Sequence, residues 1–182
     1  MNSNDESRIA SLADEISQGN LVNFTEFFNL TKKAVFYTAF SILGNESDSE
    51  DIVQETFIKF IDSHSRIKKE QSPFGFLLVI ARNSALSLLK KRKREISFPE
   101  NFDESSVPDF NDYTKAGDET FFNWMRSCLK PIEYQIVILH VINDLPHREI
   151  AKIVKRPLGS VTWIYQQAIK KLDKERKKYE KV

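Results

Sequence analysis

Apolar residues recur at spacings of three and four through most of residues 1–94, and this period predicts amphipathic helices. The apolar faces cover residues 9–16, 24–28, 35–43 and 52–60, and a last helix opens at Pro73 and runs to residue 94. Gly44 ends the third face, and Asp48 or Ser49 can cap the fourth helix. Residues 1–94 therefore predict one all-helical unit.

The pattern returns in residues 119–182, with one apolar face near the start and a second helix opening at Pro131. Two further elements follow, a short one over 146–154 and a longer one from Leu158 to Leu172, with Lys-Arg-Pro between them. A short helix, a tight turn and a longer helix with basic flanks are typical of helix-turn-helix DNA binders.

Residues 95–118 between these units have no helical period, two prolines and many acidic residues. Residues 1–94 have a net charge of +1, residues 95–119 of −7 and residues 120–182 of +7. A stretch of this length without periodicity argues against one compact domain. The sequence thus predicts an all-α protein with two helical domains (1–94 and 119–182) joined by an acidic, flexible linker (95–118).

The composition disfavours enzymes and metal proteins. The chain has 182 residues with one cysteine, three histidines and five glycines, and these form no zinc-ligand spacing and no glycine-rich phosphate loop. We therefore expect no cofactor and no catalysis. No apolar run approaches the ~20 residues of a membrane helix, and the acidic N-terminus does not resemble a signal peptide. A cytoplasmic protein is expected.

Four residues of the fourth predicted helix fall at i, i+3, i+4 and i+7 and therefore share one face. They are Asp51, Gln54, Glu55 and Ile58. Two acids, an amide and an aliphatic end suit a basic or amide-bearing partner helix. An ordinary solvated face remains the alternative.

The helix that opens at Pro73 carries Arg82 and Asn83 at its middle and ends in five consecutive cations, Lys90 to Arg94. These cations can bind phosphates through counterion release. The nearby Phe74 and Phe76 can stack on unpaired bases. The alternative is a pair of core aromatic residues with a solvated cationic cap at the helix C-terminus.

The longer helix of the helix-turn-helix carries a set of residues that can face outward, preceded by two cations. The set comprises Lys155, Arg156, Ser160, Thr162, Trp163, Gln166, Gln167 and Lys170. Glutamine can read adenine edges in the major groove, and an apolar ring can contact a thymine methyl group. A plain helical hairpin is the alternative.

Four features in this order resemble bacterial RNA polymerase sigma factors of the extracytoplasmic-function (ECF) class. They are Glu-Asp-Ile-Val-Gln-Glu-Thr-Phe at 50–57, Ile-Ala-Arg-Asn at 80–83 with its basic run, the acidic linker, and the helix-turn-helix at 145–172. The resemblance covers about residues 8–180. It implies that 1–94 is sigma domain two and 119–182 sigma domain four, with the linker threading through polymerase.

The resemblance also implies a role for each surface. Asp51, Gln54, Glu55 and Ile58 are expected to bind the clamp helices of the polymerase beta-prime subunit. Domain two is expected to melt the minus-ten element and hold an extruded base, using Arg66, Lys68, Lys69, Phe74, Phe76, Arg82, Asn83, Lys90, Lys91, Arg92, Lys93 and Arg94. Domain four is expected to bind the beta flap and to read the minus-thirty-five element with the outward set of the longer helix.

Some positions depart from the family pattern. Members usually have a tryptophan and a basic residue where this chain has Pro73-Phe-Gly-Phe76, an aspartate in place of Ser87, and a basic recognition stretch in place of Thr162-Trp163-Ile164. Three rivals follow: a stand-alone helix-turn-helix regulator, a nucleic-acid enzyme, and a sigma-like polymerase-binding protein with altered promoter reading. A separate anti-sigma partner is also expected.

Overall fold

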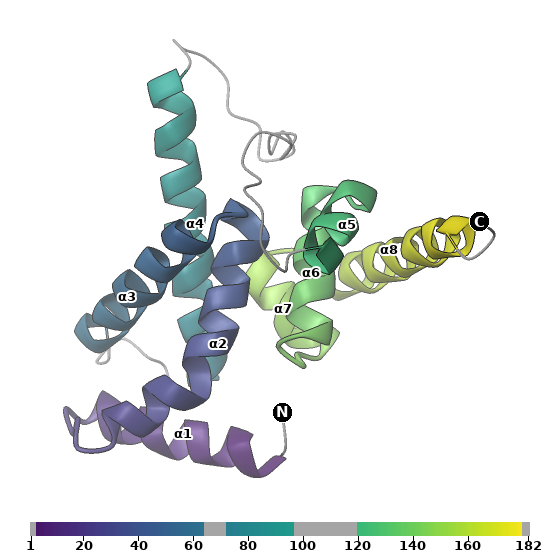
Figure 1. The fold of residues 1–182 in the computed structure, drawn as a ribbon. Helices are drawn as coiled ribbons and strands as arrows, with labels where there is room; N and C mark the ends of the chain where they lie inside the picture. The colour runs from purple at the N-terminus through teal and green to yellow at the C-terminus, as the bar shows by residue number, and fades with distance from the viewer. Residues whose placement is uncertain (1–2, 64–71, 97–119, 180–182) are drawn as a thin grey trace.

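The computed structural model describes residues 3–63, 72–96 and 120–179, and all regular secondary structure within these ranges is helical (Figure 1). The helices are α1 (Ser3–Ser17), α2 (Phe24–Leu43), α3 (Glu46–Asp62), α4 (Pro73–Ile96), α5 (Thr120–Cys128), α6 (Pro131–Val141), α7 (His147–Val154) and α8 (Leu158–Tyr179). The prediction of an all-α protein is confirmed.

The helix boundaries follow the local sequence signals closely. Prolines begin α4 and α6, where the missing N–H leaves no hydrogen bond unmade. Gly44 ends α2 with a φ of 68°, and its N–H donates to the carbonyl of Phe40. The two apolar faces predicted over 24–28 and 35–43 belong to one continuous helix, α2, because no glycine or proline interrupts the polar residues between them.

Helix α2 is the centre of the first helical group and packs against α1, α3 and α4. Five rings, which we call the phenylalanine cluster, fill the space between α2 and α3 (Phe24, Phe27, Phe28, Phe57 and Phe60). Their centroid distances run from 4.7 Å to 6.4 Å. Aromatic pairs at such separations gain about 0.5–1.5 kcal/mol beyond their buried area.

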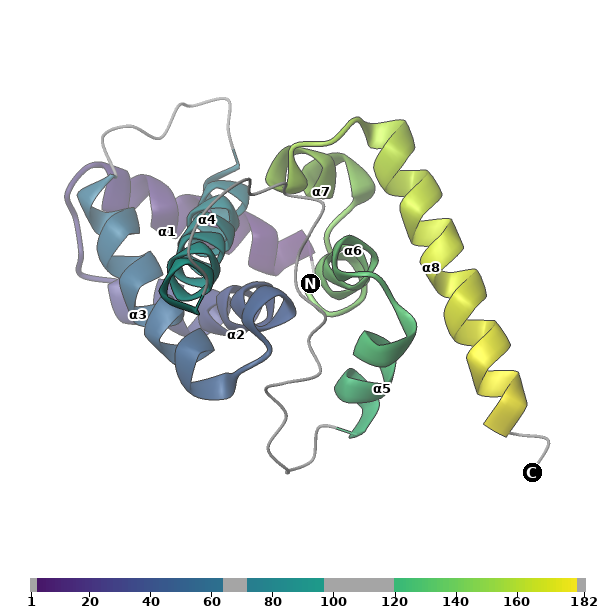
Figure 2. The same ribbon diagram turned by 90° about the horizontal axis from the view of Figure 1, so that it is seen from above.

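Helix α6 is the centre of the second group, with α5, α7 and α8 packed around it. Residues 133–139 are all buried, which agrees with a helix that is covered on all sides. Figure 2 shows why: α6 lies between the first group on one side and α8 on the other. Helix α8 extends past α6, and residues near its C-terminal end project from the body of the protein (Figure 1).

The two groups are in contact, with α2 against α6 and α4 against α7. One apolar core contains side chains from both groups. Arg126 of α5 adds a polar bridge, since its Nη2 donates to the Phe40 carbonyl at 2.7 Å. Asn143 adds another, because its Nδ2 donates to the Ala34 carbonyl and to Thr38 Oγ1, both at 3.1 Å. The domain boundaries stay a prediction, and residues 97–118 of the linker lie outside the described residues.

None of the helices in the described ranges has the length and apolarity that a membrane crossing requires. Within the same ranges no three His, Cys, Asp or Glu side chains come together in a way that could hold a metal ion.

Candidate functional site

The N-cap residue of α3 differs from the one expected from the sequence. Asn45 is the N-cap, and its Oδ1 accepts from the Asp48 N–H at 2.9 Å. The Ser49 hydroxyl donates to the Asn45 carbonyl at 2.6 Å. The expected caps, Asp48 and Ser49, are therefore inside the first turn. Asn45, three residues before Asp48, is the cap because its side chain reaches an N–H that has no intrahelical partner.

Three of the four residues predicted to share one face of α3 are exposed, namely Asp51, Gln54 and Ile58. Ile58 is 61% exposed, which is unusual for an isoleucine beside a well-packed core. The opposite side of α3 is buried. The predicted separation of the two faces is confirmed, and its outward side is available for a partner.

Glu55, the fourth residue of that face, is half-buried and is turned toward α4. Its carboxylate forms an ion pair with Lys59 and accepts from the Ser84 hydroxyl at 3.3 Å. Lys59 Nζ donates to the same hydroxyl at 3.0 Å. Glu55 thus belongs to the junction between α3 and α4, and Asp51, Gln54 and Ile58 make up the more accessible part of the face.

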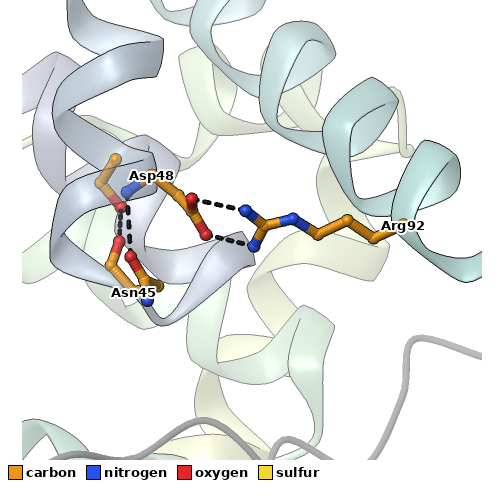
Figure 3. A network of polar contacts seen from close by, with 4 residues as sticks. Asn45, Asp48 and Arg92 are labelled. Carbon is orange, nitrogen blue, oxygen red and sulfur yellow. Dashed lines mark hydrogen bonds and ion pairs between the residues drawn. The ribbon is translucent and has the colours of Figure 1, made fainter.

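At the cationic end of α4, one arginine pairs with α3 and two other cations are exposed to solvent. Arg92 forms a two-pronged ion pair with Asp48, with Nη2 and Oδ1 at 2.6 Å (Figure 3). Asp48 lies in the first turn of α3, where negative charge is favoured, so the pair fixes α4 against α3. Lys91 and Arg94 are exposed at the same end.

The remaining residues predicted at the minus-ten surface vary in accessibility. Arg66, Lys68, Lys69 and the Lys93 side chain lie outside the described residues. Asn83 is exposed, and Arg82, Lys90 and Phe76 are half-buried. Phe76 packs against Phe60 at 6.2 Å between centroids.

The expectation that Phe74 offers its ring to bases is wrong for this structure. The side chain is 6% exposed and lies in the apolar core. Phe74 lies on the inward side of α4, and its ring packs among the other side chains of the apolar core. The alternative of a core aromatic residue, open from the sequence, is the correct one at this position.

The helix-turn-helix comprises α7, a turn at 155–157 and α8. Lys155 ends α7 in the left-handed region with a φ of 54°, and its N–H donates to the Ala151 carbonyl. Ile150 and Val161 are buried between the helices. A left-handed cap of this kind turns the chain sharply and lets α8 begin at once.

The predicted outward set of α8 faces solvent to a large degree. Trp163 is 62% exposed, and Gln166 and Lys170 are also exposed, as are Lys155 and Arg156 in the turn. Ser160, Thr162 and Gln167 are half-buried. The alternative that Trp163 packs on the preceding helix is therefore wrong.

Three rings meet behind the turn, an arrangement the sequence did not reveal. His140, His147 and Tyr165 lie with centroids 4.6–4.9 Å apart, and we call them the histidine cluster. Nδ1 of His140 donates to the Leu145 carbonyl at 2.7 Å, and Nδ1 of His147 shares a hydrogen bond with Thr162 Oγ1 at 3.2 Å. Burial lowers the pKa of His147 from its usual 6.5, and the neighbouring His140 lowers it further.

The signal for this cluster was the spacing of the two histidines. They are seven residues apart across the end of α6, which is not a metal-ligand spacing. A turn between helices α6 and α7 brings them together, and periodicity within one helix cannot show this.

Comparison with known proteins gives a consistent result. Residues 27–95 match the family model "Sigma-70 region 2". The chain is 25% identical to the RNA polymerase sigma factor SigV of Bacillus subtilis over 76% of this chain and 82% of that protein. It is 27% identical to the ECF sigma factor SigE of Mycolicibacterium smegmatis over 79% of this chain and 58% of that protein. Residues 27–95 thus match sigma-70 region 2, and the relatives that match over most of the chain are sigma factors, including ones of the ECF class.

Two further comparisons agree. The ECF sigma factor BldN of Streptomyces coelicolor is 21% identical over 92% of this chain and 66% of its own length. The sigma factor RpoE of Bartonella quintana, solved with the anti-sigma factor NepR, matches with a TM-score of 0.67 at 21% identity, covering 85% of this chain and 97% of that one. This likeness shows that the two proteins share a fold.

Proposed function

We propose that this chain is an ECF sigma factor that binds core RNA polymerase and directs it to promoters, with domain two at 1–94, linker at 95–118 and domain four at 119–182. The observation that carries the proposal is the exposed, mixed acidic and apolar face of α3 within the matched sigma region 2. The chain serves as a binding subunit without catalysis of its own, and it works in the cytoplasm, where polymerase and DNA are.

The face formed by Asp51, Gln54 and Ile58 binds the clamp helices of the beta-prime subunit. Ile58 supplies apolar area that is otherwise left in water, and the polar pair sets the register. Full burial of an isoleucine side chain contributes about 1.5–3 kcal/mol. Glu55 supports the face by bonding to Lys59 and Ser84.

The exposed cations of α4, Lys91 and Arg94, contact promoter phosphates beside the melted minus-ten element. Asn83 is presented on the same helix for the extruded base. Arg92 contributes in a different way, because its ion pair with Asp48 fixes the direction of the cationic end relative to the polymerase-binding face.

Domain four binds the beta flap and reads the minus-thirty-five element with α8. Gln166 and Lys170 are exposed as base and phosphate contacts require. Exposed Trp163 occupies the place of the family's basic recognition residue, and this favours a second candidate, a sigma-like polymerase-binding protein with altered promoter reading. An anti-sigma partner regulates the chain, in line with the complex solved for the RpoE relative.

The test is binding of purified chain to core polymerase by biolayer interferometry. We expect Asp51→Ala with Gln54→Ala to weaken binding by a factor of ten or more, which corresponds to about 1.4 kcal/mol. The matched control is Asp14→Ala with Gln18→Ala, which removes an exposed acid of α1 and an exposed amide directly after the C-terminal end of that helix. Equal binding of the α3 variant and the wild type contradicts the proposal. In vitro transcription on a cognate promoter, with the Trp163→Ala variant beside the wild type, distinguishes a sigma factor that reads the minus-thirty-five element from a sigma-like protein with altered promoter reading.

A further inference from the structure

The histidine cluster joins the two helices of the helix-turn-helix to α6. His140 lies in the last turn of α6, His147 begins α7, and Tyr165 lies on α8. Each ring is in contact with the other two, with centroids 4.6–4.9 Å apart. The three helices also pack on one another, as can be followed in Figure 2. A change in one of these rings therefore acts on the whole helix-turn-helix.

His147 connects the start of α7 to the first turns of α8. Its Nδ1 lies 3.2 Å from the Thr162 hydroxyl oxygen and shares a hydrogen bond with it. Thr162 is half-buried, and the residue that follows it, Trp163, is 62% exposed. This hydrogen bond thus holds the inner side of the segment whose outer side carries residues predicted to read DNA.

The neutral form of the His147 ring is the one that fits this place. Nε2 is buried and has no hydrogen-bond partner among the described residues. A neutral imidazole meets this condition at low cost, because Nδ1 can carry the proton and donate to Thr162 while Nε2 stays bare. A charged imidazole has an N–H at both nitrogens, and one of them would be a buried, charged donor without an acceptor. Protonation is therefore costly unless the ring leaves its position and loses Thr162.

The ionisable groups around His147 offer it no acceptor. The ones that face it are His140 of α6 and Tyr165 of α8. Asp144, before α7, acts on His140, and Glu149 of α7 is paired within its own helix. The surroundings thus contain no carboxylate that is placed to hold a charged His147 ring where it lies.

Helix α4 also packs against α7, and its charges are directed elsewhere. The first ionisable residue of α4 is Arg82, whose guanidinium donates to Gln135 of α6. Burial lowers the pKa of His147 from its usual 6.5, and His140 lowers it further. The ring is therefore neutral at pH 7.5 and takes up a proton only as the pH falls below 6.5.

We propose that His147 is a positioning residue whose neutral ring, held by His140 and Tyr165, fixes the start of α8 for minus-thirty-five recognition through Thr162. A charged ring leaves this place, and the first turns of α8 lose a contact with α7. Reading of the minus-thirty-five element then weakens in acid, while the polymerase-binding face of α3 in the other helical group is unaffected. The inference rests on the function proposed for domain four and adds the residue that holds its reading helix.

The first measurement uses the full chain without polymerase or DNA. Hydrogen exchange followed by mass spectrometry, corrected for the intrinsic effect of pH, reports on the amides of residues 158–166 at pH 7.5 and 5.5. We expect the wild type to lose protection in this segment at the lower pH. His147→Phe keeps a ring and takes up no proton, so its protection should be the same at both pH values. An equal response to pH in the two proteins overturns the proposal.

The second measurement uses the holoenzyme and two DNA duplexes. One is a duplex that the wild-type holoenzyme selects from a random-sequence pool at pH 7.5, and the other has the same sequence with a scrambled minus-thirty-five element. The ratio of the two affinities isolates reading of that element, because other effects of pH are common to both duplexes. Between pH 7.5 and 5.5 the wild-type ratio should fall about threefold to tenfold, the effect of one lost hydrogen bond. A constant wild-type ratio overturns the proposal.

Two variants of His147 separate the hydrogen bond from the ring. His147→Phe cannot bond to Thr162, so its ratio should be low at both pH values. His147→Asn places an amide near the position of Nδ1 and does not titrate, so its ratio should stay closer to the wild-type value at both pH values. His147→Asn also decides the question if His147→Phe fails to fold, because a ratio that falls with pH in this variant overturns the proposal.

Arg148→Gln is the matched control, since it removes an exposed charge directly beside His147 and outside the histidine cluster. Its ratio should fall with pH as the wild-type ratio does. A constant ratio in this control would show that charge near the DNA causes the pH response, which overturns the proposal. A holoenzyme that selects no duplex at pH 7.5 contradicts the proposed function itself, whereas failure of the inference alone leaves selection intact with a ratio independent of pH.

Discussion

The phenylalanine cluster of the first group and the histidine cluster of the second have similar geometry and different chemistry. In both, rings from adjoining helices lie about 5–6 Å apart, and most pairs are tilted or edge to face, with Phe27 and Phe60 stacked. The first consists of hydrocarbon rings only. The second joins two imidazoles to a phenol and includes hydrogen bonds to Leu145 and Thr162.

The difference shows how the same packing can serve two purposes. The phenylalanine cluster gains its stability from buried area and is indifferent to pH. The histidine cluster lies directly behind the helix-turn-helix, where Tyr165 also packs against the apolar clusters of both groups. Its stability depends on the protonation state of His147, whose pKa is lowered by burial. We therefore expect the two groups to respond differently to truncation and to acid.

Phe57→Ala should have the largest effect, because Phe57 contacts Phe24, Phe27 and Phe28. Removal of a buried phenylalanine ring costs about 3–5 kcal/mol. Urea unfolding followed by far-UV circular dichroism measures the loss. Phe121→Ala, at a ring that is 58% exposed in the second group, should cost far less. Similar losses of unfolding free energy in both variants would mean that a ring of the phenylalanine cluster stabilises the fold no more than an exposed ring does.

Arg126→Gln should have the next largest effect, since this residue connects the two groups. Its guanidinium lies 5.2 Å from the ring centres of both Phe40 and Tyr134 and caps α2 through the Phe40 carbonyl. Loss of a charged hydrogen bond typically costs about 1.5–3 kcal/mol. Urea unfolding measures the loss, and Arg126→Lys should restore only part of it because lysine lacks the planar fork. Full rescue by lysine would show that charge alone is needed.

Tyr165→Leu should cost about 1–2 kcal/mol, because the two ring contacts with His140 and His147 disappear while part of the apolar area remains. Tyr165→Phe is the control, since it keeps the ring. The unfolding free energy at neutral pH is the measurement. A loss as large as that of Phe57→Ala would contradict the ranking of the two clusters.

The pH dependence should be the smallest effect and the sharpest distinction. The lowered pKa of His147 means that the unfolded chain binds a proton more readily than the folded chain does. This contribution is fully favourable above pH 6.5 and is lost as the pH falls below that value toward the folded pKa. Urea unfolding between pH 7.5 and 5 should show a shallower decline in His147→Gln than in the wild type. Parallel curves would contradict this account.

Local signals in the sequence predicted much of the helical structure. Pro73 and Pro131 mark helix starts because they lack an N–H, and Gly44 marks an end because its left-handed φ suits glycine. A Cβ at Gly44 would overlap the guanidinium group of Arg126, which adds a tertiary reason for this glycine. The outward direction of Trp163 followed from the 3.6-residue period, which assigned the inward positions of α8 first.

The features that the sequence did not predict depend on contacts between distant helices. The pairing of Arg92 with Asp48 needs the relative placement of α3 and α4. The inward position of Phe74 depends on which face of α4 meets the core, and its surrounding residues are apolar on several sides. Arg82 of α4 donates to Gln135 of α6, and these two residues come from separate groups that the sequence predicted as two domains. Hydrophobic periodicity shows which side of each helix is apolar. It does not show which other helix that side packs against.

The exposure of Trp163 has a spectroscopic consequence. The chain has two tryptophans, Trp124 and Trp163, and both are in the second group. Trp124 is half-buried and stacks on Phe121, with 5.9 Å between the ring centroids, whereas Trp163 on α8 is exposed to solvent. Tryptophan emission therefore reports on the second group alone, and in a Trp124→Phe background it reports on the surroundings of Trp163 on the recognition helix. A blue shift of that emission marks the moment at which this surface loses water to DNA or to a protein partner, without any attached dye.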